Sequence, residues 1–203
     1  MPSRREFIQA GLCVSLLPRA IPGDRLAPAS GIGAMKGNVH AIYRVVSDAR
    51  FSPSVAFGIE AERLGSPLTM IQGDITDLWF NDLSIRWREG PIALAGLTAH
   101  GPLFCLERFA WDHGLRVVFR AEHQSVGSGV AAHSITGPSD TLARIGSLRL
   151  GDLDWPRAFA RIATACDAGS PGSASVRITT PWIGAAEPDE PLVSWVIAPI
   201  TRA

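Results

Sequence analysis

The sequence predicts a single α/β domain with a mainly parallel sheet, helices on both faces, a C-terminal helix and two edge strands. Three observations support this fold class. Between residues 38 and 124, short apolar runs alternate with helical patterns in the order β-α-β-α-β-α-β. Residues 91–98 carry no polar side chain before Thr98, which is typical of a strand covered on both faces. A chain of 203 residues is long enough for one domain with a buried core.

The first half of the pattern contains two strands and two helices. Residues 38–46 are rich in β-branched side chains and predict the first strand. Ser52 is a suitable N-cap for the following helix, and Pro53 after it suits the first helical position. Residues 67–72 predict the second strand, and either Asp74 or Thr76 caps the helix after it.

The second half contains the strand at residues 91–98, a helix and another strand at 115–121. The helix begins at Gly101-Pro102 and stops before Gly114, which suits a left-handed position. Apolar residues cover most of its surface. We therefore expect this helix to be buried or covered by another molecule.

The C-terminal part is less regular. Gly, Ser and Ala dominate residues 125–139, which predicts a loop. Within residues 140–203, Asp154 begins a helix with a clear apolar side. Two apolar segments follow, at 175–179 and 192–198, and they could pair with each other or extend the edge of the sheet.

The N-terminal segment has the pattern of an export signal. Two adjacent arginines, Arg4 and Arg5, precede a polar residue and Phe7, and a short apolar stretch follows. This pattern resembles the twin-arginine translocation signal of bacteria. The resemblance covers residues 1–29 and implies export of a folded chain to the periplasm, with membrane contact only during export. It also implies cleavage after Ala29, which leaves residues 30–203 as the mature domain.

Charge and cysteine content exclude some classes of site. The 19 basic and 19 acidic residues cancel and form no basic run, which argues against nucleic acid as a partner. Cys105 and Cys166 remain after the signal, either as core residues or as a disulfide in the periplasm. No cysteine or histidine spacing predicts a structural zinc site, and the sequence leaves open whether the protein binds a cofactor and which one.

Polar residues follow each predicted strand of the parallel sheet. Ligands bind beyond the carboxyl ends of such strands, so these residues are the candidate site. Carboxylates and imidazoles there suit acid/base chemistry or a metal ion. Asp74 and Thr76 have the alternative role of helix caps. The candidates for catalysis are Asp48, Asp74, His100, Glu122 and His123, and those for ligand binding are Arg50, Thr76 and Thr98.

His100 and His123 are the candidate metal ligands. His100 begins a predicted helix, where the macrodipole favours the neutral imidazole that coordinates metals. The chain has neither a G-x-S-x-G motif after a strand nor a G-x-G-x-x-G motif between a strand and a helix. The sequence therefore favours no nucleophilic serine and no dinucleotide site.

Two functional interpretations follow. The first is a periplasmic accessory protein that binds a small molecule or a protein partner, the latter co-exported by the same route. Its support is the signal pattern and the six tryptophans, because Trp and Arg are enriched at interfaces. The second is a metal-assisted hydrolase or lyase that uses the residues at the strand ends.

Overall fold

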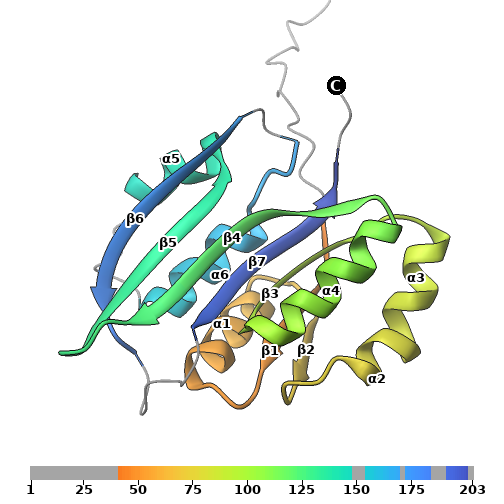
Figure 1. Ribbon diagram of the computed structural model, residues 1–203, viewed down its shortest axis with the longest axis horizontal. Helices are drawn as coiled ribbons and strands as arrows, with labels where there is room; N and C mark the ends of the chain where they lie inside the picture. Colours follow the sequence, from red (N-terminus) through yellow and green to blue (C-terminus); the bar gives the residue numbers. More distant parts are fainter. Residues whose placement is uncertain (1–40, 148–153, 170–171, 184–190, 201–203) are drawn as a thin grey trace, which may run out of the picture. The chain divides into compact units, whose positions relative to one another are not determined.

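A computed structural model describes residues 41–147, 154–169, 172–183 and 191–200, which belong to one compact unit. The N-terminal signal pattern lies outside the described residues. In the described part the chain forms one sheet of seven strands, in the order β2-β1-β3-β7-β4-β5-β6 (Figure 1). The strands are β1 (Ile42–Asp48), β2 (Leu68–Ile71), β3 (Ala93–Ala99), β4 (Leu115–Ser125), β5 (Val130–Pro138), β6 (Ser173–Pro181) and β7 (Leu192–Pro199).

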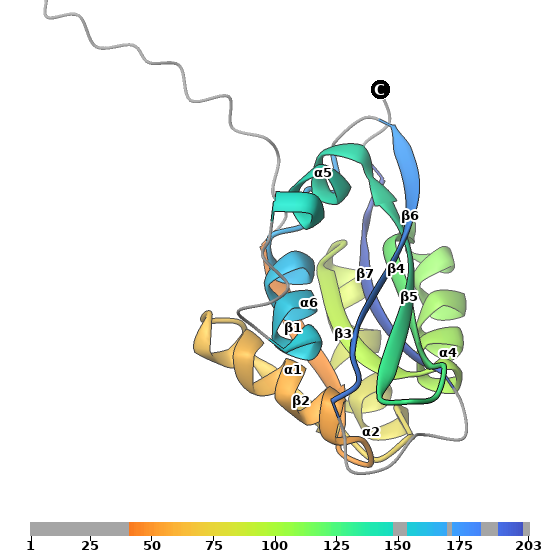
Figure 2. The same cartoon turned by 90° about the vertical axis from the view of Figure 1, so that its left-hand side faces the viewer.

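Helices cover both faces of this sheet, as predicted. They are α1 (Ser52–Arg63), α2 (Thr76–Leu78), α3 (Ser84–Glu89), α4 (His100–Asp112), α5 (Ser139–Ser147) and α6 (Trp155–Thr164), and the π-helical turn η1 (Trp79–Leu83) joins α2 to α3. Figure 2 shows α1, α5 and α6 on one side of the sheet and α4 on the other. None of the helices in the described residues is long and apolar enough to cross a membrane.

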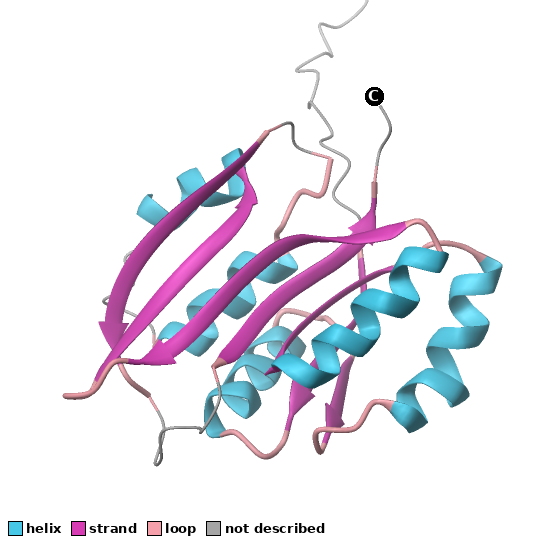
Figure 3. Cartoon of the chain, viewed as in Figure 1, coloured by secondary structure: helices cyan, strands magenta, loops and turns pink. Residues whose placement is uncertain are grey.

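The sheet is mixed, so the prediction of a mainly parallel sheet is wrong. β1 pairs in parallel with β2 and β3, but every other pair is antiparallel. The cause is β7, which inserts between β3 and β4 (Figure 3). Residues 192–198 are all buried, so this apolar segment is a central strand and not the predicted edge strand.

The prediction of a loop at residues 125–139 is also wrong. Only the segment around Gly127 and Gly129 turns, with positive φ angles of 84° and 70°. The residues after it form β5, which pairs with β4 on one side and β6 on the other. β6 is an edge strand, as predicted.

The sheet separates two apolar cores. Val45, Phe57 and Phe159 belong to the core between the sheet and the α1–α6 side. Val46, Leu103 and Trp195 belong to the core on the α4 side. The alternation of Val45 and Val46 between cores follows from the two-residue period of a strand. Cys105 is exposed and Cys166 is buried, and neither forms a disulfide.

Candidate functional site

The carboxyl ends of β1 and β2 carry a fixed ion pair. Arg50 donates from Nε to Asp48 Oδ1 at 2.9 Å and from Nη2 to Oδ2 at 2.6 Å. The Asp48 carboxylate is buried, and the guanidinium extends over Gly73 at the end of β2. A Cβ at Gly73 would lie 2.5 Å from Arg50 Cζ. This bidentate pair therefore holds both candidates in a structural contact between neighbouring strands.

A buried serine network lies behind this pair and was not predicted. Ser47 donates its hydroxyl to the carbonyl of Ser54 at 2.9 Å. Ser54 Oγ accepts from the backbone N–H of Asp48 at 2.7 Å and donates to the carbonyl of Leu97 on β3. These bonds fix the first turn of α1 against β1 and β3.

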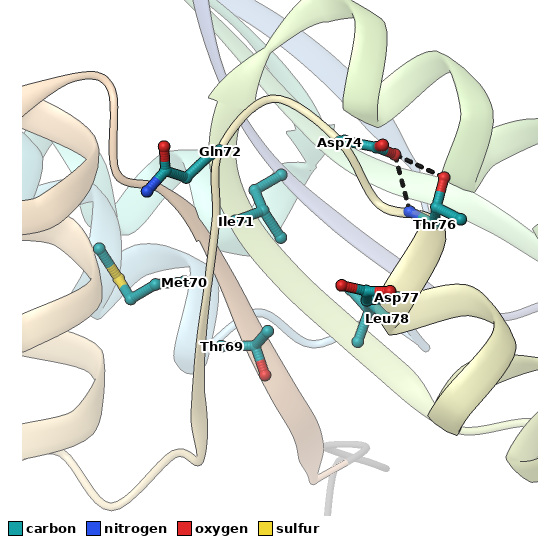
Figure 4. A pocket seen from close by; sticks show the side chains of 8 residues that line it. All are labelled: Thr69, Met70, Ile71, Gln72, Asp74, Thr76, Asp77 and Leu78. Carbon is teal, nitrogen blue, oxygen red and sulfur yellow. Dashed lines mark hydrogen bonds between the residues drawn. The ribbon is translucent and has the colours of Figure 1, made fainter.

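Asp74 and Thr76 form a turn at the start of α2. Asp74 Oδ1 accepts from Thr76 N at 2.8 Å and from Thr76 Oγ1 at 2.7 Å (Figure 4). The bonds from Thr76 lower the pKa of Asp74. Asp74 thus stabilises the turn that leads into α2, while the N-cap position of that helix is Ile75.

These two residues also line a surface pocket of about 390 Å³ beside β2. Its polar groups are hydroxyl, amide and carboxylate, which suit a polar ligand with hydrogen-bond donors. The lining residues are Thr69, Met70, Ile71, Gln72, Asp74, Thr76, Asp77 and Leu78.

Thr98 and His100 follow β3 but differ in exposure. Thr98 is buried, donates to the carbonyl of Ala99 at 2.9 Å and accepts from Trp195 Nε1 at 3.1 Å. His100 is exposed at the first position of α4. Thr98 is therefore engaged inside the protein, whereas His100 is open to solvent.

Glu122 and His123 lie on opposite faces of β4. Glu122 is exposed, and His123 is fully buried on the α6 side. Successive strand residues alternate between faces, so these two side chains cannot act on one ligand. No group of three potential metal-binding side chains occurs among the described residues.

His123 belongs instead to a buried hydrogen-bonded chain across four strands. Ser194 Oγ lies 2.6 Å from His123 Nε2, and His123 Nδ1 lies 2.7 Å from His133 Nδ1. His133 Nε2 lies 2.8 Å from Thr180 Oγ1. The Thr180 hydroxyl donates to the carbonyl of Pro181 at 3.2 Å. We call Ser194, His123, His133 and Thr180 the histidine chain.

The hydrogen bond that Thr180 donates to Pro181 fixes which atom is the donor in every other hydrogen bond of the histidine chain. Because Thr180 donates to Pro181, its oxygen accepts the N–H of His133 Nε2. His133 Nδ1 then accepts from His123 Nδ1, and His123 Nε2 accepts the hydroxyl of Ser194. With this assignment every ring nitrogen has one partner and both imidazoles are neutral.

Aromatic side chains of α6 cover the two imidazoles. The ring centroid of Trp155 lies 4.5 Å from that of His123, and the Phe159 centroid lies 4.5 Å from His123 and 5.2 Å from His133. Burial lowers the pKa of His133 from 6.5 to about 4. Burial, and secondly the adjacent His133, lower the pKa of His123 well below its usual value.

The exposed side of α4 carries two large aromatic side chains on the other face of the sheet. Phe104 and Trp111 are 52% and 44% exposed. Arg108 lies between them in the sequence, with its guanidinium carbon 3.8 Å from the Trp111 ring centroid and 5.7 Å from that of Phe104. We call Phe104, Arg108 and Trp111 the α4 patch.

A hollow lies beside α4. A pocket of about 300 Å³ is lined by Glu107 of α4 and by residues of β4, β5 and β6. Glu107 and Arg120 of β4 approach to 3.7 Å across it. A molecule bound to α4 could therefore extend toward this part of the sheet.

Comparison with known proteins identifies no relative. No family model, no curated protein and no solved structure matches this chain.

Sequence reasoning missed His133 and Ser194, and it predicted cover for α4 without identifying Phe104, Arg108 and Trp111 as its exposed residues. His133 was hidden in the predicted loop, although residues 130–138 follow a Gly-Ser-Gly turn that is typical of a hairpin. Recognising that turn would have placed His123 opposite His133.

Proposed function

We propose that the chain is an accessory protein that binds a protein partner through the α4 patch. The observation that supports this most directly is the exposure of two large aromatic side chains on one side of a single helix. The sequence predicts that most of the surface of this helix is apolar, so that the helix is either buried or bound by another molecule. Exposed aromatic groups next to an arginine are typical of interaction sites.

The α4 patch suits a partner surface with an apolar centre and a hydrogen-bond acceptor. Phe104 and Trp111 sit at positions i and i+7, so they project from the same side of the helix. Arg108 stacks on Trp111, which leaves the edge of its planar guanidinium to bind a carboxylate or carbonyl. The neighbouring hollow gives the partner additional contact area.

The test is substitution of the patch. Phe104→Ser combined with Trp111→Ser is expected to remove a stoichiometric partner from the purified protein, because the apolar centre of the interface is lost. Size-exclusion chromatography with light scattering measures the mass of the complex. Ile59→Ser is the matched control, since Ile59 is 53% exposed on α1 and faces away from the α4 side. Retention of the partner by the double variant would refute the proposal.

We also propose that the protein acts in the periplasm after twin-arginine export. The support is the Arg4-Arg5 pattern and the apolar stretch behind it. Replacing both arginines with lysine is expected to stop export, and Arg19→Lys is the control outside the paired motif. The readout is the ratio of periplasmic to cytoplasmic protein. Undiminished export of the Arg4→Lys, Arg5→Lys variant would contradict the proposed route.

A further inference from the structure

The histidine chain ties the outer strands to the centre of the sheet. His123 of β4 and His133 of β5 are direct cross-strand partners, so their side-chain contact adds to the backbone ladder. Ser194 extends the chain to central β7, and Thr180 extends it to edge strand β6. The chain therefore crosses β7, β4, β5 and β6 beneath α6.

This arrangement has no satisfactory place for an added proton. A proton on His123 Nε2 would take away the acceptor of the Ser194 hydroxyl and leave a buried charge. A proton on His133 Nδ1 would bring two N–H groups face to face across 2.7 Å. Both events place an imidazolium charge in the core, and the second also breaks the hydrogen bond between the two rings.

Within the described part of the chain, the charged groups of the neighbouring elements have other partners, are exposed or lie on the opposite face. From α6, Trp155 and Phe159 face the rings, while Asp154 binds Arg157. Arg161 of α6 binds Glu60, and Glu122 of β4 points to the opposite face. Among the described residues, Arg120 of β4 approaches Glu107 of α4 on the opposite face, and Arg116 of β4 binds the carbonyl of Leu115. Arg177 on β6 is exposed and shares the face of Glu122. On α5, Asp140 is exposed and Arg144 binds the carbonyl of Ala165.

We propose that the histidine chain is an acid-sensitive latch that releases the Trp155 end of α6 and the β5–β6 pair, while β1, β2 and β3 stay folded and Arg161 still binds Glu60 of α1. The release is local because Trp155 rests on the rings by packing alone: its indole nitrogen has no hydrogen-bond partner in the described part of the chain. β1, β2 and β3 contain no histidine in their described residues, and their contacts with α1 use serine and apolar groups.

Hydrogen exchange of the full chain between pH 7.5 and 4.5, corrected for intrinsic exchange rates, tests the latch. Protection of the amides at the Trp155 end of α6 and in β5 and β6 is expected to fall at least tenfold at acid pH, with little change in β1 and β3. His133→Gln is expected to reduce this acid response without abolishing it, because glutamine does not titrate but the buried His123 remains. His100→Gln, at the exposed start of α4, should behave like the unchanged protein. Equal loss of protection across the sheet, or an unchanged response in His133→Gln, would overturn the proposal.

Nitrogen-15 NMR of the unchanged protein gives a second test that needs no variant to fold. At pH 6 the ring nitrogens of His123 and His133 are expected to show two neutral imidazoles, each with one protonated nitrogen. Titration of either ring with an ordinary midpoint near 6.5 would rule out the latch.

Discussion

At the residue scale, Gly96 lacks a side chain, and this absence allows Trp195 to pack against the central strand β3. The Trp195 indole lies against Gly96, and its Nε1 donates to Thr98. A Cβ on Gly96 would lie 2.5 Å from the indole ring and 2.6 Å from the carbonyl oxygen of Val46. The backbone carbonyl cannot move as a flexible side chain could.

Gly96→Ala is therefore expected to lower the free energy of unfolding by about 2 to 3 kcal/mol through overpacking. Urea unfolding followed by tryptophan fluorescence measures this loss. Gly101→Ala is the control, because a Cβ there meets no atom within 4 Å. Equal stability of the two variants would show that Trp195 is not held as described.

Single residues also show what sequence reasoning could establish. The predicted strand ends drew attention to polar side chains, but the roles of these side chains depend on partners far along the chain. Thr98 is engaged by Trp195, 97 residues away, and His123 by Ser194, 71 residues away. No local sequence pattern encodes such contacts. The sequence could therefore point to candidate residues but could not determine their roles.

At the element scale, Glu60 links α1 to α6. Its carboxylate binds Arg63 of α1 at 2.9 Å and Arg161 of α6 at 2.7 Å. The hydrogen bond from Arg63, with further bonds and charge from Arg161, lowers the pKa of Glu60 from 4.5 to about 2 against the opposing effect of burial. Because the folded pKa is the lower one, this stabilisation is complete above pH 4.5 and is lost as pH falls toward 2.

Glu60→Gln is expected to reduce the free energy of unfolding at pH 7 by about 1 kcal/mol, a modest value because both arginines are partly exposed. The variant should also lose part of the pH dependence between 4.5 and 2. Thermal unfolding across this pH range measures both effects. Glu62→Gln, exposed on the same helix, is the control, and identical pH profiles for the two variants would contradict the assigned role.

Elements with strong local signals were predicted well. The helix from Ser52 and the apolar strands near residues 67–72 and 91–98 all occur close to their expected limits. Pairing order was predicted poorly, because an apolar run marks a covered strand without indicating its direction or neighbours. β7 was placed at the edge for this reason, although both of its faces are buried.

At the scale of the whole molecule, the two faces of the sheet have different roles in our account. The α1–α6 face holds the histidine chain and is closed by packed helices. The other face is covered by α4, whose outer side carries the α4 patch, and this patch is exposed in the described chain. An exported protein that folds before transport can carry such a patch if a partner covers it.

Native mass spectrometry of the protein purified from periplasm tests this central claim most directly. We predict one mature chain with a second polypeptide in fixed ratio, and a bare mature chain after the substitutions at Phe104 and Trp111. A lone chain in the unchanged sample would contradict the account. If that lone chain carried a metal ion, His100, which is open to solvent, would become the first position to substitute.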